Sequence, residues 1–338
     1  MKQISYFKGS PKEVGLSNGK ILGKKLDRTI GKFIEGIKDI YGIDFQKLER
    51  EALLWLCSLP LHFQEELEGT AEGAGIPLQR VAEWCFADLC TNDSCSGFVC
   101  SIDGDAWVAR NNDYILPELW GYTIIRDIDS RIPTMIFGME GEIFSATGIN
   151  KEKLWLHYNW LSVWDNPSGE KQCLTPYVFL REALETCRTI RDVENLLKNI
   201  ERDGGLNLFA IDGKSNEFTI FECTCSSYKR REPKNGHISA TNHYCSLKTP
   251  DKFQNGTKSS LNRLQRIDEL LKDKVFNELP EDLIDILGDS RVEQNSKKVG
   301  TVYANVACPR KGLVWYAYGG FPAASRGTWH QLDWPWRE

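Results

Sequence analysis

Apolar residues recur at helical spacing through the first part of the chain. The clearest run stands three or four residues apart, at Leu22, Leu26, Ile30, Phe33, Ile37 and Ile40. Such spacing, with charged residues in between, predicts an amphipathic helix. Further helices are expected over about 44–58 with Asp44 as N-cap, from 63 to 72, and from 77 to 89. The first ninety or so residues are therefore predicted to be helical.

Near residue 94 the pattern changes to short runs of strand-forming residues. Strands are expected at about 96–102, 105–113, 122–128, 134–139, 143–147, 154–160, 206–212, 218–223, 300–307 and 313–318. Helices are expected at about 176–187, 190–200, 259–271 and 280–287. Many strands lack polar alternation, which indicates sheets covered on both faces. This order predicts a mixed α/β (α+β) protein built as a four-layer αββα sandwich of mostly antiparallel sheets.

The composition is that of an ordinary globular protein. The chain has 338 residues, 26% of them charged, and a net charge of −5. No dense basic stripe supports nucleic-acid binding, and the short basic run at 228–231 reads as a solvated turn. No stretch approaches the ~20 apolar residues of a membrane span. Because no signal peptide is recognisable, we expect a cytoplasmic protein that binds neither nucleic acid nor membranes.

The chain contains 11 cysteines, an odd number. Without a secretory signal, a disulfide framework is not expected in so long a chain. Cys85, Cys90, Cys95 and Cys100 recur every five residues, a spacing that matches no zinc-binding pattern. We therefore expect mostly reduced core thiols, with neither a metal ion nor another cofactor.

Cys95 differs from the other cysteines because of the sequence that follows it. Two strand-like runs flank Asp103 and Gly104, and Asp-Gly is the strongest two-residue hairpin signal. If these residues form the turn, Cys95 pairs with Asn112, and Arg110 lies one diagonal step away on the same face. A guanidinium beside a thiol favours the thiolate, which attacks carbonyl carbons. The local geometry therefore predicts a nucleophile, Cys95, beside an electrostatic partner, Arg110.

Six segments in one order along the chain carry a resemblance to a known family. They are Thr-Ala-Glu-Gly-Ala-Gly-Ile at 70–76, Cys95, Arg-Asn-Asn-Asp-Tyr at 110–114, Gly-Ile-Asn-Lys-Glu-Lys-Leu at 148–154 followed by Asn159, Ala-Thr-Asn-His at 240–243, and Ser-Ser-Leu-Asn-Arg at 259–263. Together they resemble the N-terminal-nucleophile (Ntn) hydrolases of the choloylglycine hydrolase and penicillin acyltransferase type. The resemblance implies the αββα Ntn-hydrolase sandwich and a cysteine nucleophile.

The resemblance also implies a role for each matching residue. Cys95 would become a new N-terminus through autocleavage of the Ser94–Cys95 bond, so that its own α-amine serves as general base. Arg110 would stabilise the thiolate, and Asp113 would orient the α-amine or balance its charge. The other catalytic residues would be two oxyanion donors and a late arginine, namely Asn159, Asn242 and Arg263.

The same resemblance implies how the chain is divided and what it acts on. Residues 1–94 would be a helical propeptide retained as a small subunit, and residues 95–338 the αββα catalytic domain. The substrate would be a small N-acyl amide or thioester, which is hydrolysed or whose acyl group passes to an amine. Aromatic residues near the oxyanion strand would line the acyl pocket, namely Trp155, Tyr158 and Trp160. Whether the chain forms a homo-oligomer stays open.

Two alternatives remain at this point. His157 or His243 could serve as the imidazole base of a cysteine enzyme that needs no free α-amine. The chain could also be an unprocessed binding relative, because many members of the family carry glycine, or another residue suited to strained cleavage, where this chain has Ser94. An uncut chain with an unreactive Cys95 would favour that second alternative.

Overall fold

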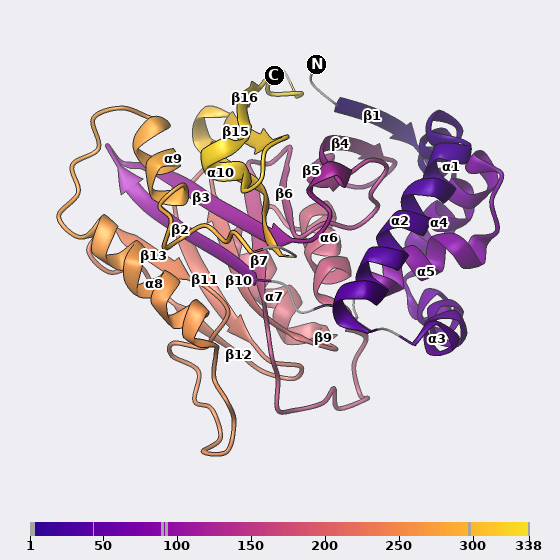
Figure 1. Cartoon of the computed structure of the whole chain (residues 1–338), viewed down its shortest axis with the longest axis horizontal. Coiled ribbons are helices and arrows are strands. Elements are labelled where there is room, and N and C mark those ends of the chain that lie inside the picture. The colour runs from indigo at the N-terminus through magenta and orange to yellow at the C-terminus, as the bar shows by residue number, and fades with distance from the viewer. Residues whose placement is uncertain (1–3, 43, 89–90, 92–93, 297–298, 337–338) are drawn as a thin grey trace. The chain divides into compact units, whose positions relative to one another are not determined.

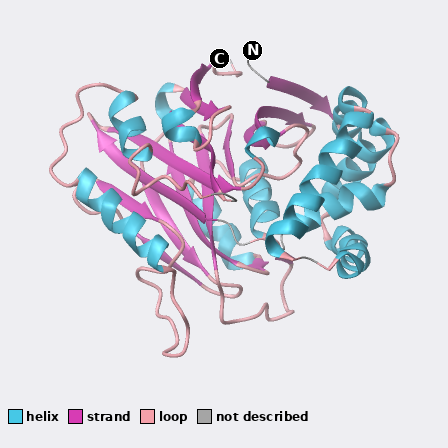
Figure 2. Ribbon diagram, viewed as in Figure 1, coloured by secondary structure: helices cyan, strands magenta, loops and turns pink. Residues whose placement is uncertain are grey.

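The chain divides into two compact units, the first made of residues 1–92 and 122–145 and the second of residues 93–121 and 146–338. The computed structural model describes residues 4–42, 44–88, 91, 94–296 and 299–336. Figures 1 and 2 show the helices and strands of each unit. Among the described residues, no helix has both the length and the apolar character that a membrane crossing requires.

The first unit combines helices with a small group of strands. Its helices are α1 (Pro11–Leu22), α2 (Lys24–Tyr41), α3 (Phe45–Ser58), α4 (Leu61–Ala74) and α5 (Leu78–Asp88). Its strands are β1 (Ile4–Gly9), β4 (Trp120–Ile128) and β5 (Thr134–Met139), in the order β1-β4-β5. The predicted helices are confirmed, with Gly23 separating α1 from α2. β1 was not expected, and it pairs in parallel with β4.

Helices α1 and α4 are in backbone contact because glycines line both sides of their interface. Gly15 and Gly19 lie on α1, and Gly69 and Gly73 lie on α4. A Cβ atom added at Gly15 would lie 2.1 Å from the carbonyl oxygen of Glu66, and one at Gly69 would lie 2.3 Å from a backbone oxygen of α1. Since no side chain fits such gaps, these glycines set how closely the two helices pack.

The second unit contains two sheets that face each other, each covered by helices (Figure 1). One has the order β6-β7-β10-β11-β12, with β6 (Thr147–Asn150), β7 (Leu154–Leu161), β10 (Gly205–Asp212), β11 (Phe218–Cys223) and β12 (Tyr228–Arg231). The other has the order β13-β2-β3-β14-β15-β16, with β13 (His237–Ala240), β2 (Ser94–Ile102), β3 (Asp105–Tyr114), β14 (Gly300–Cys308), β15 (Leu313–Tyr318) and β16 (Thr328–Leu332).

Helices complete the outer layers of this unit. The first sheet is covered by α6 (Pro176–Thr186) and α7 (Ile190–Asn199), and the second by α8 (Lys258–Leu271), α9 (Glu281–Leu287) and α10 (Ala323–Arg326). Short elements between them are β8 (Cys173–Leu174), β9 (Glu201–Arg202) and two 3-10 turns, Pro117–Leu119 and Pro309–Lys311. The predicted four-layer αββα sandwich is therefore confirmed.

Two sequence-based expectations are corrected by the structure. The strand expected at 143–147 is wrong, because β6 begins only at Thr147. The apolar residues that suggested this strand are buried by packing, since the ring of Phe144 contacts those of Trp55 and Phe63. The basic run at 228–231, expected as a turn, is the edge strand β12, where charged side chains discourage pairing with another chain.

Candidate active site

The hairpin of β2 and β3 has the turn and the register that its sequence predicts. Asp103 and Gly104 have positive φ angles of 51° and 81°, as a two-residue type I′ turn requires. Cys95 is paired with Asn112, which confirms the predicted register. A turn formed by local sequence therefore determines which residues lie beside Cys95.

The side chains of this hairpin alternate between two faces. We call the face toward β7 the inner face; it carries Cys95, Arg110 and Asn112. We call the face toward α8 and α9 the outer face; it carries Ser96 and Asp113. The nucleophile expected from the sequence and the carboxylate expected to assist it therefore lie on opposite faces of one hairpin.

On the inner face, Arg110 is in contact with the sulfur of Cys95. Arg110 Nη2 lies 3.4 Å from Cys95 Sγ and donates a hydrogen bond to Asn112 Oδ1 at 2.8 Å. Arg110 Nη1 donates to the backbone oxygen of Ala146 at 2.6 Å. Cys95 Sγ is 3.7 Å from Asn112 Oδ1. These bonds fix the guanidinium so that one edge faces the sulfur.

Arg110 is completely buried, and no carboxylate of the described residues lies at ion-pair distance from it. Burying an unpaired charge is costly, and a guanidinium does not lose its proton to avoid that cost. Among the groups that touch Arg110, the thiol of Cys95 is the one that can become negatively charged. The inner face therefore favours a thiolate at Cys95.

The backbone of Cys95 is held by two side chains from distant parts of the chain. The N–H of Cys95 donates to Asn242 Oδ1 at 2.9 Å. Arg263 of α8 donates through Nη1 to the carbonyl oxygen of Cys95 at 2.6 Å and through Nη2 to Asn242 Oδ1 at 2.9 Å. Because Asn242 Oδ1 receives both bonds, its oxygen faces the nitrogen of Cys95.

Asp113 is buried on the outer face and lies opposite Ser94 in the strand register. Thr301 Oγ1 donates to Asp113 Oδ1 at 2.6 Å, and Arg263 Nη1 lies 3.9 Å from Oδ2. Burial raises the pKa of Asp113 to about 6, while Arg263, Thr301 and Arg110 oppose the rise. Asp113 Oδ2 accepts no hydrogen bond within the described part of the chain. The carboxyl is therefore ionised at neutral pH with one oxygen still able to bind a donor.

The two asparagines expected to be oxyanion donors bind backbone carbonyls in this structure. Asn242 Nδ2 donates to the oxygen of Trp160 at 2.9 Å. Asn159 Nδ2 donates to the oxygens of Ala240 and Thr241 at 2.9 and 3.3 Å. Both hydrogens of Asn159 Nδ2 are therefore in use. The structure brings Asn242 to Cys95 and places Asn159 behind residues 240–243.

Comparison with protein-family models gives a match over residues 100–322 to the acyl-coenzyme A:6-aminopenicillanic acid acyl-transferase family. The chain belongs to this family. Membership of this family supports an enzyme that acts on amide bonds or transfers acyl groups. The matched range begins just after Cys95 and contains the other expected catalytic residues, namely Arg110, Asp113, Asn159, Asn242 and Arg263.

Three enzymes of known structure are similar to this chain. The conjugated bile acid hydrolase of Clostridium perfringens is 15% identical, over 71% of this chain and 92% of its own, with a TM-score of 0.47. The N-acylethanolamine-hydrolyzing acid amidase ortholog of Caenorhabditis elegans is 16% identical, over 64% and 93%, with a TM-score of 0.46. The penicillin V acylase of Agrobacterium tumefaciens is 14% identical, over 71% and 86%, with a TM-score of 0.47. Comparison with curated protein sequences gives no match.

The three aromatic residues expected to line an acyl pocket in this family member do not share one face of β7. Trp155 lies on the same face as Asn159, whereas Tyr158 and Trp160 lie on the other face, because successive strand residues alternate. Trp155 is fully buried, and its indole N–H donates to His157 Nδ1 at 3.0 Å. The strand therefore does not direct the three rings toward a single pocket.

The two candidate imidazole bases have Nδ1 atoms that are engaged away from Cys95. His157 is completely buried, and burial, with Arg110 adding to the effect, holds its pKa well below the usual value. His243 Nδ1 lies 2.8 Å from Ser260 Oγ, and burial also lowers its pKa. Both rings are therefore neutral at pH 7, and His157 adds no second positive charge near Arg110.

The other buried cysteines lie in surroundings that oppose ionisation. Cys100 occupies the outer face of the same strand as Cys95, and burial raises its pKa to about 12. Burial also raises the pKa of Cys187 and Cys223 to about 12. The cysteines that the structure describes form no disulfide with one another. No cluster of three metal-ligating side chains surrounds Cys95 among the described residues.

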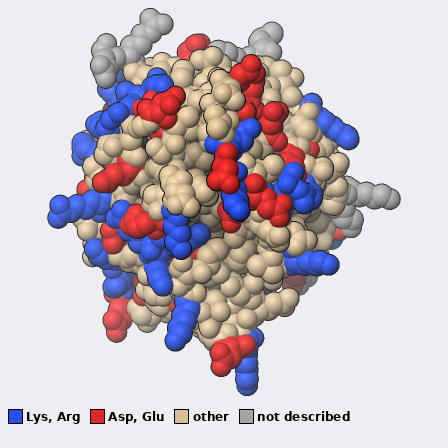
Figure 3. Space-filling view, turned by 90° about the vertical axis from the view of Figure 1, so that its left-hand side faces the viewer, with Lys and Arg blue, Asp and Glu red and all other residues tan. Residues whose placement is uncertain are grey.

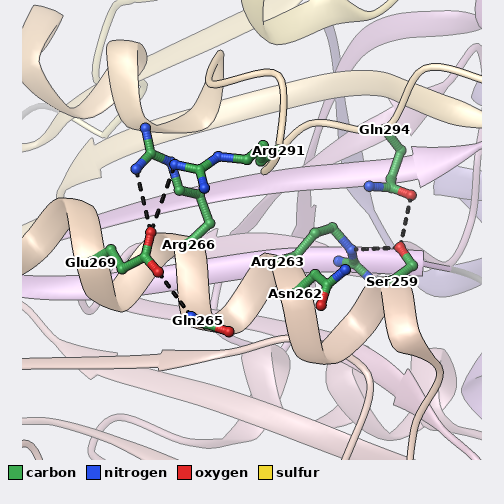
Figure 4. Close-up of a pocket in the computed structure, with 8 residues that line it drawn as sticks. All are labelled: Ser259, Asn262, Arg263, Gln265, Arg266, Glu269, Arg291 and Gln294. Carbon is green, nitrogen blue, oxygen red and sulfur yellow. Dashed lines mark hydrogen bonds and ion pairs between the residues drawn. The ribbon is translucent and has the colours of Figure 1, made fainter.

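The far side of Arg263 lines a surface cavity of about 450 Å³ over α8. Arg263 Nε donates to Ser259 Oγ at 3.4 Å, and Ser259 Oγ donates to Gln294 Oε1 at 3.1 Å (Figure 4). Other arginines of this cavity are paired with acidic side chains, including Arg266 with Glu269. Acidic and basic side chains are also interspersed over the molecular face that contains α8 (Figure 3). The lining of the cavity therefore supports Arg263 from outside, and it has more basic than acidic groups, namely three arginines and Glu269.

Two residues at this site were missed by the sequence reasoning. Thr301 binds Asp113 although 188 positions separate them, and no local sequence pattern predicts such a contact. Asn207 binds the backbone of residues 241 and 243. Its signal was present, because it is a polar residue inside the apolar run of the predicted strand at 206–212.

Proposed function

We propose that the protein is a self-processing cysteine amidohydrolase that cleaves linear N-acyl amide bonds through a Cys95 acyl-enzyme. The observation that carries this proposal is the 3.4 Å contact between Cys95 Sγ and Arg110 Nη2. Arg110 is buried and lacks a carboxylate partner within the described residues. A thiolate at Cys95 supplies the missing negative charge, so that the cost of burying the arginine favours the ionised sulfur.

The first reaction is cleavage of the chain by its own nucleophile. Cys95 Sγ attacks the carbonyl carbon of Ser94, the S–C bond forms, and the bond from that carbon to the nitrogen of Cys95 breaks. The thiol proton ends on the released nitrogen, which becomes the α-amine. Water then hydrolyses the thioester, giving a carboxylate at Ser94 and returning a thiol at Cys95. The hydrogen bond from the N–H of Cys95 to Asn242 Oδ1 supports this step by fixing the scissile peptide.

The α-amine of Cys95 is then the general base for the substrate. An α-amine has an ordinary pKa of about 7.7–8.0, so that part of it is neutral at pH 7 and can accept the thiol proton. Asn242 Oδ1, which accepts from this nitrogen before cleavage, can go on accepting from it afterwards. Asp113 Oδ2, which accepts no hydrogen bond in the described structure, would balance the charge of the protonated amine.

The substrate reaction repeats the same chemistry on an external amide. The sulfur attacks the carbonyl carbon, the carbon–nitrogen bond breaks, and the α-ammonium gives its proton to the leaving amine. Water, deprotonated by the α-amine, then releases the carboxylic acid from the thioester. Asn242 Nδ2 carries two hydrogens and can donate to an oxyanion as well as to Trp160. Asn159 could join it only by giving up a bond to residues 240–241.

Intact mass and N-terminal sequencing of the purified chain test the self-processing. We expect two fragments, the larger beginning at Cys95. Cys95→Ala should remain whole, whereas Cys100→Ala, a buried cysteine of the same strand on the outer face, should be cut like the wild type. A wild-type chain that stays whole, or a Cys95→Ala chain that is cut, would contradict the proposal.

A second candidate function is acyl transfer to an amine, and the acyl-transferase description of the matching family favours it. Both functions share the acyl-enzyme and differ in whether water or an amine attacks the thioester. With an N-acyl substrate and an added amine, transfer predicts a new N-acyl product. Hydrolysis predicts only the free acid, in the same yield with or without the amine.

We also propose that residues 1–94 stay bound as a small subunit after the cut. The first unit contains residues from both sides of the cleavage point, and they are held together by contacts of several kinds. β1 pairs with β4, and Glu66 forms a buried ion pair with Arg126 at 2.8 Å. Asn18 donates to the oxygen of Gly141 at 2.9 Å. The two fragments should therefore elute together in native size-exclusion chromatography and separate only in denaturant.

A further inference from the structure

Asn207 of β10 and Asn159 of β7 are directly opposite each other in the strand register and are both completely buried. Asn207 Nδ2 donates to the carbonyl oxygens of Thr241 and His243 at 3.0 and 3.1 Å. Asn159 Nδ2 donates to Ala240 and Thr241. The two amides thus bind the carbonyls on both sides of residue 242 from the opposite sheet.

The residue between these carbonyls is Asn242, whose side chain receives the N–H of Cys95. Asn242 Oδ1 is 2.9 Å from the nitrogen of Cys95, and the N–H of Asn242 donates to Ser260 Oγ at 2.9 Å. A movement of this short segment would carry Oδ1 away from the nitrogen of Cys95. The bonds from Asn207 oppose such a movement because they join the segment to the middle of a strand.

Within the described structure, the side chain of Asn207 makes its hydrogen bonds to the carbonyl oxygens of Thr241 and His243. Its neighbours along β10 are apolar, including Leu206, Leu208 and Phe209, and its Oδ1 has no hydrogen-bond partner among the described residues. An amide buried without full hydrogen bonding is costly. An apolar residue would fill this position in the sheet at lower cost. The presence of an amide at this position is therefore best explained by its hydrogen bonds to the carbonyl oxygens of Thr241 and His243.

We propose that Asn207 is a positioning residue, which holds Asn242 Oδ1 against the nitrogen of Cys95 by binding the carbonyls of Thr241 and His243. The inference rests on the proposed role of Cys95 as nucleophile and of its α-amine as base. It predicts that losing the amide of Asn207 disturbs the orientation of that nitrogen. The rates of autocleavage and of sulfur alkylation should then fall, although Asn207 touches neither atom.

The chain contains a matched control for this substitution. Asn150 of β6 is also completely buried, and its Nδ2 donates to the carbonyl oxygens of Leu184 and Cys187, each at 2.8 Å. These carbonyls lie at the end of α6, away from the segment that carries Asn242. Asn150→Leu therefore removes the same pair of donated bonds in a different place, and it also removes the bond that Asn150 Oδ1 accepts from the N–H of Leu154 at 3.1 Å.

The experiment compares wild type, Asn207→Leu and Asn150→Leu. It measures the rate of fragment formation and the pH profile of Cys95 alkylation by iodoacetamide, read by peptide mass, with thermal unfolding alongside. We expect both variants to lose thermal stability. We expect only Asn207→Leu to slow both rates, by about tenfold or more, and to move the midpoint of the alkylation profile.

Two additional variants keep the test decisive. In an Asn242→Ala background, Asn207→Leu should have little further effect on either rate, because its action passes through Asn242. If Asn207→Leu does not fold, Asn207→Ser, which keeps one donor, should give an intermediate rate.

The outcomes separate the two proposals. If wild type is cut and alkylated rapidly but Asn207→Leu or Asn207→Ser slows these rates no more than Asn150→Leu, the positioning role is wrong. The positioning role is also wrong if the effects of Asn207→Leu and Asn242→Ala simply add. If the wild-type chain stays whole and Cys95 is alkylated no faster than the buried Cys100, the proposed function itself fails.

Discussion

The hairpin of β2 and β3 meets a buried arginine on each of its faces, and the two arginines have different partners. Arg263 on the outer face lies 3.9 Å from the carboxylate of Asp113. Arg110 on the inner face has no carboxylate at that distance among the described residues and instead touches the sulfur of Cys95. One cation is therefore already neutralised in the fold, while the other meets its negative charge only when the thiol ionises.

The two faces of one hairpin therefore have different roles: the outer face contributes to stability, and the inner face controls the reactivity of the Cys95 sulfur. On the outer face, the charge of Arg263 is balanced within the fold once Asp113 is ionised, so that substitutions should change stability and its dependence on pH. On the inner face, the balance depends on the state of Cys95, so that substitutions should change sulfur reactivity more than stability. Variants on each face can test that separation.

Arg263→Met should have the largest effect, because it leaves Asp113 buried and charged without its partner. At pH 8 the free energy of unfolding should fall by about 3–5 kcal/mol, measured by urea denaturation. At pH 5, where Asp113 is protonated, the loss should be smaller. Arg291→Met removes an exposed arginine that pairs with Glu269, and it should cost well under about 1 kcal/mol at both pH values. Equal losses for Arg263→Met at pH 5 and pH 8 would mean that the charge of Asp113 is not the cause.

A comparison of wild type with Asp113→Asn should show how the raised pKa of this carboxyl makes the unfolding free energy depend on pH. The folded protein keeps the proton up to about pH 6, whereas the unfolded chain loses it near pH 4. The stability that this group contributes is therefore present at low pH and lost as the pH rises through about 6. Relative to Asp113→Asn, wild type should lose about 2 kcal/mol of unfolding free energy between pH 4 and pH 7.

The control for this prediction is a carboxylate with the opposite shift. A hydrogen bond from Lys311 lowers the pKa of Asp105, so that its stabilising contribution is present at neutral pH and lost as the pH falls. Wild type should therefore gain stability relative to Asp105→Asn as the pH rises. If Asp113→Asn and Asp105→Asn gave the same sign, the buried carboxyl would not hold its proton as described.

Thr301→Val should have an intermediate effect on the outer face. The substitution removes the hydroxyl that donates to Asp113 at 2.6 Å. A hydrogen bond to a charged group contributes about 2 kcal/mol, so that stability should fall by about that amount at pH 8 and by less at pH 5. The matched variant is Thr219→Val, whose buried hydroxyl donates to the neutral carbonyl of Arg231 at 2.6 Å. Its cost should not change with pH, and neither variant should alter alkylation of Cys95 more than about twofold.

Arg110→Met should have the smallest effect on stability and the most specific effect on the reactivity of Cys95. Without the guanidinium, alkylation of Cys95 by iodoacetamide at pH 7 should slow by about tenfold, which corresponds to about 1.4 kcal/mol. Replacing a buried charge with an apolar side chain of similar size should leave stability unchanged or improve it. Alkylation of the exposed Cys57 in the same sample is the internal standard. An unchanged rate at Cys95 would show that Arg110 does not support the thiolate.

The part of the site that the sequence could predict is the part made by neighbours along the chain. Asp103 and Gly104 form a turn from their own preferences, and that turn alone pairs Cys95 with Asn112 and brings Arg110 to the sulfur. The outer face depends instead on Thr301 and Arg263, which reach the hairpin through long-range packing. Periodicity does not encode such contacts.

The asparagines show the same limit at the level of single atoms. The order of the motifs in the sequence predicted that Asn159 and Asn242 lie near Cys95. It did not tell which end of each amide faces Cys95, because that depends on donors and acceptors from other strands. The expected strand at 143–147 failed for a related reason, since an apolar run such as that around Phe144 is buried equally well by helix packing.

The two-residue turn of the hairpin also limits how its length can vary between related chains. Because side chains alternate, a change that slides one strand past the other by a single residue would move Cys95 from Arg110 to the face of Asp113. A slide by two residues would restore the face but change the neighbour. Insertions are therefore tolerated only where the loop absorbs them without moving the pairing. The pairing of the two strands can therefore shift only by an even number of residues if Cys95 is to stay on the face of Arg110.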